Sequence, residues 1–230
     1  MPEGPRGRES RPRAPRPRDP LREELANAVT HGLGAALSIV GLVLLLAAAS
    51  LQSSPGRVAA LVVYGATLVL LYLASTLYHA TRDDGRKRFF RLCDHAAIFL
   101  LIAGTYTPYA LIALDDATGW ALFAAVWTIA ILGIAFKVVC LDRYEGLSLA
   151  LYLGMGWLGI LALSPLLDRL HQDGLVLLAL GGVAYTGGVV FFLWERLPYG
   201  HAVWHLFVLA GSAFHFLSIY LYLAQPGSLA

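Results

Sequence analysis

Seven apolar stretches in this sequence are each long enough to cross a membrane as a helix. A spanning helix needs about 20 predominantly apolar residues. The stretches are Ala26–Leu51, Val58–His79, Leu92–Leu114, Trp120–Leu141, Leu147–Leu166, Leu175–Trp194 and His201–Ala224. The sequence therefore predicts an all-α, polytopic membrane protein with seven transmembrane helices.

The overall composition supports the same class. Of the 230 residues, 58% are hydrophobic and only 14% are charged, and the mean hydropathy is +0.65. A soluble domain of this size needs more polar surface. The breaks between the stretches are short, so we expect one transmembrane domain, residues 23–230, and no soluble domain. The net charge is only +2, and we expect no nucleic-acid partner.

Small residues lead to two packing expectations. We expect Cys93 and Cys140 to be small buried side chains, because two cysteines cannot build a disulfide scaffold. Glycines in the fifth and sixth stretches are expected to allow close helix packing. They are Gly154, Gly156, Gly159, Gly181, Gly182, Gly187 and Gly188.

The basic residues predict the orientation in the membrane, since Lys and Arg favour cytoplasmic loops. Alternate loops differ sharply in their content of these residues, which places the N-terminus in the cytoplasm and the C-terminus outside. One side holds Arg6, Arg8, Arg11, Arg13, Arg16, Arg18, Arg22, Arg82, Arg86, Lys87, Arg88, Arg91, Lys137, Arg143 and Arg196, and the other only Arg57 and Arg169.

Residues 1–22 form a distinct N-terminal segment. Its Pro-, Arg- and Gly-rich sequence cannot build a core, so we expect a disordered basic tail that contacts anionic lipid headgroups. A cleaved signal peptide is the alternative, because Ala47-Ala48-Ala49-Ser50 resembles a cleavage site. The apolar stretch is too long for a signal peptide and carries Asn27 and His31.

Ionisable residues gather at the predicted cytoplasmic ends of four spans. They are His31, His79, Asp94, His201 and His205. Such residues are costly at membrane depth and usually mark a functional site. Because these side chains arrive at one depth from four helices, the sequence predicts a metal-binding pocket.

Helical spacing narrows the ligand set. His201 and His205 are four residues apart and share a helix face, and His79 can supply a third nitrogen. Three histidines with an open fourth position are typical of catalytic zinc. A pair of hydrogen-bonded interior histidines, or histidines that face headgroups, is the alternative for His201 and His205.

Two further residues are candidates for catalysis. Asp94 can bind the ion directly, or accept a hydrogen bond from its water as a general base. Its alternatives are an ion pair with Arg91 and an N-cap of the third span. Ser75 shares the face of His79 and can donate to the water or to a substrate oxygen, although a bond to its own helix backbone explains it almost equally well.

The other polar residues are expected to play supporting roles. Glu24, Asn27 and His31 form one polar stripe, which we interpret as support behind the ligands or as contacts between helices, with His31 as a substitute ligand. His95 lies about 100° around the helix from Asp94 and points elsewhere. His215 lies about 15 Å deeper than His205, too far to share the ion. It is the only polar group that we identify deep in the bundle.

These motifs resemble the hemolysin III family, within the progestin and adipoQ receptor group. The matching motifs are Glu24-x-x-Asn27-x-x-x-His31, Ser75-x-x-x-His79, Asp94 and His201-x-x-x-His205, and the resemblance runs from about Glu23 to Tyr222. It implies zinc on His79, His201 and His205, with Asp94 and Ser75 around a zinc-bound water. The minimal loops resemble the bacterial branch, which implies a multi-pass protein of the bacterial inner or plasma membrane and argues against a hormone-receptor role.

Three functions are compatible with this reading. The group is similar to the alkaline ceramidases, which implies a zinc-dependent hydrolase of a lipid amide whose substrate occupies a bundle cavity. The hemolysin label of the bacterial members implies a pore-forming or cytolytic protein. A membrane sensor or regulator with structural zinc is the third alternative.

Overall fold

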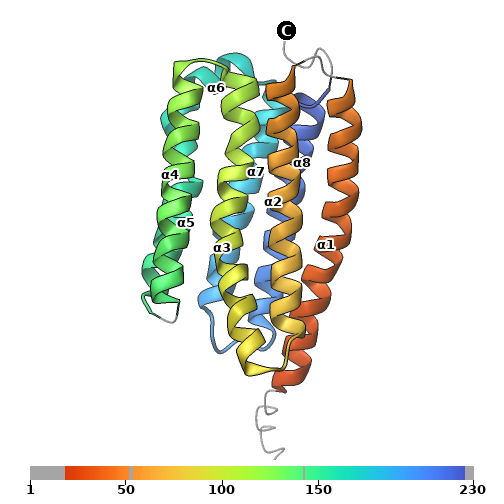
Figure 1. The fold of residues 1–230 in the computed structure, drawn as a ribbon, viewed down its shortest axis with the longest axis vertical. Coiled ribbons are helices and arrows are strands. Elements are labelled where there is room, and N and C mark those ends of the chain that lie inside the picture. The colour runs from red at the N-terminus through yellow and green to blue at the C-terminus, as the bar shows by residue number, and fades with distance from the viewer. Residues whose placement is uncertain (1–18, 52–53, 142, 226–230) are drawn as a thin grey trace, which may run out of the picture.

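The computed structural model describes residues 19–51, 54–141 and 143–225, and these form a bundle of long, roughly parallel and antiparallel helices (Figure 1). The helices are α1 (Pro20–Ser50), α2 (Pro55–Ala80), α3 (Asp84–Pro108), η1 (Tyr109–Leu114), α4 (Ala117–Cys140), α5 (Glu145–Gly156), η2 (Leu158–Ala162), α6 (Leu163–Arg169), α7 (Gln172–Leu193) and α8 (Gly200–Tyr222). Within the described ranges, seven helical segments are long and apolar enough to cross a membrane. The predicted all-α, seven-span architecture is confirmed.

Helices distant in the sequence pack side by side. α1 packs against both α2 and α8, and α3 lies between α2 and α4 (Figure 1). The end of α2 and the starts of α1 and α8 therefore meet at one end of the bundle. This is the end at which the predicted metal-ligating residues lie.

Aspartates define three of the helix starts. The carboxylates of Asp19, Asp83 and Asp116 accept hydrogen bonds from backbone amides at the starts of α1, α3 and α4. Because α1 begins at Pro20, residues 20–22 belong to the helix rather than to the expected tail. The rest of that expected tail, residues 1–18, lies outside the described part of the chain.

The fifth span is interrupted, contrary to the expected continuous helix Leu147–Leu166. The α-helix stops at Gly156 and is followed by the 3₁₀ segment η2 and the short α6. The hydroxyl of Tyr106 donates to the carbonyl of Gly156 (2.7 Å) and accepts from the amide of Gly159 (2.7 Å). One side chain of α3 thus satisfies backbone groups that the break releases, as hydrocarbon surroundings require.

Several packing expectations need correction. A Cβ at Gly154 or Gly156 would meet nothing within 4 Å, so these glycines do not provide close packing in the described chain. Gly181 does, since a Cβ there would clash with the ring of His215. Cys93 and Cys140 are only partly buried, and Cys140 is the last residue of α4.

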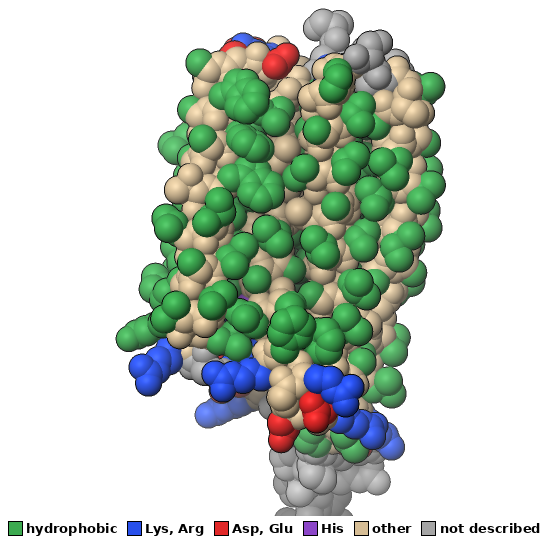
Figure 2. Space-filling view, in the orientation of Figure 1, with side chains coloured by type: hydrophobic (Ala, Val, Ile, Leu, Met, Phe, Trp, Pro, Cys, Tyr) green, Lys and Arg blue, Asp and Glu red, His purple; other side chains and the backbone are tan. Residues whose placement is uncertain are grey.

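The surface is apolar along the sides and charged at the ends (Figure 2). Side chains such as Leu33, Leu37, Val40 and Val43 are more than half exposed on α1, as expected of a lipid-facing helix. Cations gather at one end, here named the basic end. Its described cations are Arg22, Arg82, Arg86, Lys87, Arg88, Arg91, Arg143 and Arg196. That this end faces the cytoplasm remains a prediction from the positive-inside rule.

Gly133 offers a test of the packing between α3 and α4. A Cβ at Gly133 would clash with the fully buried ring of Phe99, so we expect Gly133→Ala to destabilise the protein by about 1–3 kcal/mol. Gly154→Ala, in an open helical position, should be neutral or stabilising by up to about 1 kcal/mol. Thermal unfolding of the purified variants in detergent measures both. Equal melting temperatures would contradict the packing described.

Candidate metal centre

Three histidines converge at the basic end, between the end of α2 and the start of α8. His79 lies in the last turn of α2, and His201 and His205 lie in the first two turns of α8. One nitrogen from each lies within 4.8 Å of the other two. The structure thus brings together the three ligands expected from the sequence, in a group that can hold a metal ion.

His79 is oriented by a carboxylate from α1. Its Nδ1 lies 2.8 Å from Oε2 of Glu24, and its Nε2 is buried with no hydrogen-bond partner among the described residues. A carboxylate on one ring nitrogen directs the other nitrogen toward a metal and raises its basicity. Glu24 therefore lies where a supporting residue is expected.

His205 is oriented by the backbone and by a hydroxyl of α1. Its Nδ1 lies 3.2 Å from the carbonyl oxygen of Asn27 and 3.1 Å from Oγ1 of Thr30. Because the Thr30 hydroxyl donates to the carbonyls of Ala26 and Asn27, its oxygen is available to accept from His205. Nδ1 then carries the proton, and Nε2 is left for a metal.

Asn27 differs from the expectation in its role, and Thr30 was not expected to take part. Asn27 contacts His205 through its backbone oxygen, while its side-chain Oδ1 is buried with no described partner. Thr30 was not a candidate in the sequence, although it is adjacent to His31 and three residues after Asn27. Its contact crosses from α1 to α8, and such a contact becomes visible only when the two helices are packed.

His201 completes the group and is the more exposed member. Its ring centroid lies 4.6 Å from that of His205 and 5.2 Å from that of His79. His201 is partly exposed, whereas His79 and His205 are buried. This side of the group is therefore the one most open to water.

His31 lies beside the group without joining it. Its ring stacks on that of His205, with a centroid distance of 3.4 Å and an interplanar angle of 12°. The lone pair of an imidazole lies in the ring plane, so His31 presents its face, and not a ligand atom, to His205, while both of its own ring nitrogens are buried with no hydrogen-bond partner among the described residues. The ring of Tyr72 lies at 89° to that of His31, with a centroid distance of 5.0 Å. These contacts favour a supporting role for His31 rather than that of a ligand.

Asp94 and Ser75 lie beside one another at the contact of α2 and α3. Ser75 is 1% exposed, and Asp94 is its acidic neighbour. The N-cap alternative for Asp94 is wrong, because α3 begins ten residues earlier and is capped by Asp83. The Ser75 bond to its own helix is likewise absent from the described hydrogen bonds.

A groove at the basic end reaches His79. It has a volume of about 460 Å³ and runs between the start of α1 and the end of α2. Its lining joins apolar side chains to polar ones of the centre: Leu21, Glu24, Leu25, Ala28, His79, Ala80, Thr81, Arg82 and Lys87. A lipid chain can therefore approach His79 along an apolar wall.

Polar groups also extend deeper into the bundle than the sequence indicated. The hydroxyls of Tyr72 and Tyr185 each lie 2.7 Å from Oγ of Ser212. The ring of Tyr185 lies 5.5 Å from that of His215, whose Nε2 is 3.1 Å from the carbonyl of Leu178. His215 is thus one member of a polar row from α2, α7 and α8, and it bonds to the backbone of the neighbouring helix α7.

A seven-span helical bundle with three histidines joined at one end defines an integral membrane protein with a candidate metal centre. The comparisons identify its family. A family model described as Haemolysin-III related matches residues 20–216, and the chain belongs to this family.

Named relatives cover most of the chain. "Hemolysin-3" of Bacillus cereus is 48% identical over 208 residues, which are 90% of this chain and 95% of the relative. "Hemolysin-3 homolog" of Bacillus subtilis (strain 168) is 43% identical over 202 residues, which are 88% of this chain and 95% of the relative. "Monocyte to macrophage differentiation factor" of Homo sapiens is 30% identical over 207 residues, which are 87% of this chain and 84% of the relative. The family expected from the motifs is confirmed.

The two stacked histidines offer a matched test of the ligand set. We expect wild-type protein to bind about one Zn²⁺ per chain, His205→Phe to lose it, and His31→Phe to retain it, because only His205 supplies a ligand atom. Metal analysis after purification and dialysis measures the stoichiometry. Thermal unfolding of each variant confirms that it is folded. Loss of zinc in His31→Phe would instead make His31 a ligand.

Proposed function

We propose that this protein is a zinc-dependent hydrolase that cleaves an amide bond of a membrane lipid at its basic end. One observation carries the proposal: three histidines offer nitrogens within 4.8 Å of one another, and one of them, His79, lines a groove together with apolar side chains of α1. By the positive-inside rule, this end faces the cytoplasm.

The donor set suits zinc. Imidazole nitrogens are preferred zinc ligands, and three of them leave a fourth position for water or substrate. The Nδ1 atoms of His79 and His205 donate to Glu24 and to the carbonyl of Asn27, and these hydrogen bonds orient the two rings, as partners of metal-ligating histidines do. A structural site is usually closed by a fourth protein ligand. His31 is the nearest candidate, and its stacked geometry does not favour that role.

Zinc on these histidines supplies a Lewis acid that polarises a carbonyl and activates water. The chain supplies the remaining functions. Asp94 accepts a proton from the water and returns it to the leaving amine nitrogen as the carbon–nitrogen bond breaks and the carbon–oxygen bond forms. Ser75, held beside Asp94, donates to an oxygen of the substrate, and Leu21, Leu25 and Ala28 hold its apolar chain.

Release of fatty acid from a ceramide-like lipid tests the proposal. We expect turnover by the purified wild type, loss of turnover with a chelator or in His205→Ala, and a decrease of about 10²–10⁴-fold in Asp94→Asn. Asp173→Asn removes an exposed carboxylate at the opposite end of the bundle and should leave the rate unchanged. Equal release by wild type and His205→Ala would exclude the hydrolase.

A pore-forming or cytolytic protein is the second candidate. Two relatives carry the name Hemolysin-3 or its homolog, and the row of Tyr72, Ser212, Tyr185 and His215 provides polar groups along the bundle interior. A conducting path requires such groups in the membrane.

Leakage of a trapped dye from liposomes distinguishes the two candidates. For a hydrolase, we expect leakage by the pure wild-type protein to match that of empty liposomes, because the described polar row is closed by its own hydrogen bonds. Leakage that persists in His79→Ala and falls in Ser212→Ala would favour the pore.

A further inference from the structure

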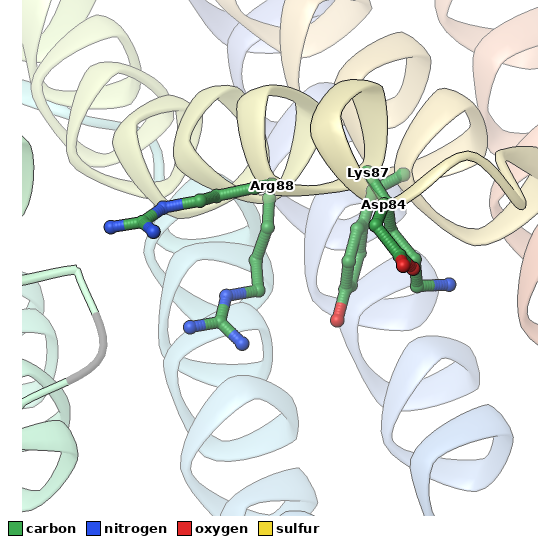
Figure 3. Close-up of a pocket in the computed structure, with 5 residues that line it drawn as sticks. Asp84, Lys87 and Arg88 are labelled. Carbon is green, nitrogen blue, oxygen red and sulfur yellow. The ribbon is translucent and has the colours of Figure 1, made fainter.

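A second cavity at the basic end is lined mainly by cations. It has a volume of about 250 Å³ and lies where the first turns of α3 meet the end of α2 (Figure 3). Three cations, one acid and one aromatic ring form its wall: Lys87, Arg88, Arg91, Asp84 and Tyr78. This set, named the cationic pocket below, carries a net charge of +2 and is distinct from the groove at His79, with which it shares only Lys87.

The walls of the cationic pocket are held in place by contacts between α2 and α3. The ammonium of Lys87 lies 4.9 Å from the ring centre of Tyr78, and Arg91 is a hydrogen-bond partner of the Tyr78 side chain. Lys87 also pairs with Oε1 of Glu24 at 3.2 Å. The pocket is therefore a defined arrangement of charges and not only a run of basic residues in a loop.

A further cation lies behind Arg91 in the interior. Lys137, in the last turn of α4, is 1% exposed, and no carboxylate of the described residues lies at ion-pair distance from it. Arg91, His95 and Glu145 are its ionisable neighbours.

The position of the cationic pocket matches the level of lipid headgroups. Phe89, adjacent to Arg88, is 60% exposed, and Leu77, adjacent to Tyr78, is 37% exposed. Apolar and cationic side chains that alternate at the end of a span are typical of the membrane interface. Basic pockets between spans at this level bind lipid phosphates.

We propose that the cationic pocket binds the phosphate of an anionic phospholipid from the adjacent leaflet. The guanidinium groups of Arg88 and Arg91 match the geometry of phosphate oxygens, and Lys87 adds a third positive charge. A lipid with a net negative headgroup is favoured over a zwitterionic one, because the quaternary amine of the latter meets the same cations. This site is formed by residues at the end of α2 and the start of α3. Binding of a lipid there does not depend on hydrolysis of any lipid.

Native mass spectrometry of the full chain, with phosphatidylglycerol or phosphatidylcholine added, tests the site. We expect wild-type protein to prefer phosphatidylglycerol, and the double variant Arg88→Gln/Arg91→Gln to bind it about tenfold more weakly. The matched control is Arg143→Gln/Arg196→Gln, which removes two exposed cations from other loops at the same end. We expect the control to stay within about twofold of wild type.

Inorganic phosphate distinguishes the two sources of the ligand. If it displaces phosphatidylglycerol and raises the melting temperature of wild type but not of the double variant, the pocket binds free phosphate as well as lipid phosphate. If inorganic phosphate neither displaces phosphatidylglycerol nor raises the melting temperature, the pocket binds the phosphate only as part of a lipid. Equal preference for phosphatidylglycerol in wild type and the double variant, or an equal loss in the control, overturns the proposal. These readouts involve neither zinc nor turnover, so they stand apart from the hydrolase test.

Discussion

The carboxylate of Glu24 joins three helices at the basic end. It lies on α1, holds Nδ1 of His79 on α2 through one oxygen, and pairs with Lys87 on α3 through the other. Because Glu24 is about one third exposed, its pairing with Lys87 contributes little to the free energy of unfolding. Its structural effect is one of orientation: it aligns an imidazole and brings α1 and α3 to either side of the end of α2.

The same arrangement links the two cavities of the basic end. Lys87 lines both the groove that reaches His79 and the cationic pocket beside Tyr78. Apolar walls predominate in the groove, whereas cations predominate in the pocket. Under the two proposals above, a lipid chain occupies the groove beside His79 and a lipid phosphate occupies the cationic pocket, both at one end of the bundle.

Residue periodicity and composition were sufficient for much of the fold. Seven apolar stretches predicted seven spans, since the length of a spanning helix is set by the thickness of the hydrocarbon layer. The break in the fifth span was not predicted, because its compensation comes from Tyr106, a residue about 50 positions away on another helix. The start of α3 was placed too late for a related reason, since its charged first turns lie outside the apolar stretch that defined the span.

For the centre, the sequence alone determined the residue types and their level in the bundle. The spacing of His201 and His205 places them on one helix face, and loop charge places His79 at the same end. The tertiary structure decided which atoms meet. The stacking of His31 on His205, the contact from Thr30, and the buried Lys137 behind Arg91 all depend on how helices rotate against their neighbours. That rotation is set by the packing of whole helix faces, which local spacing does not specify.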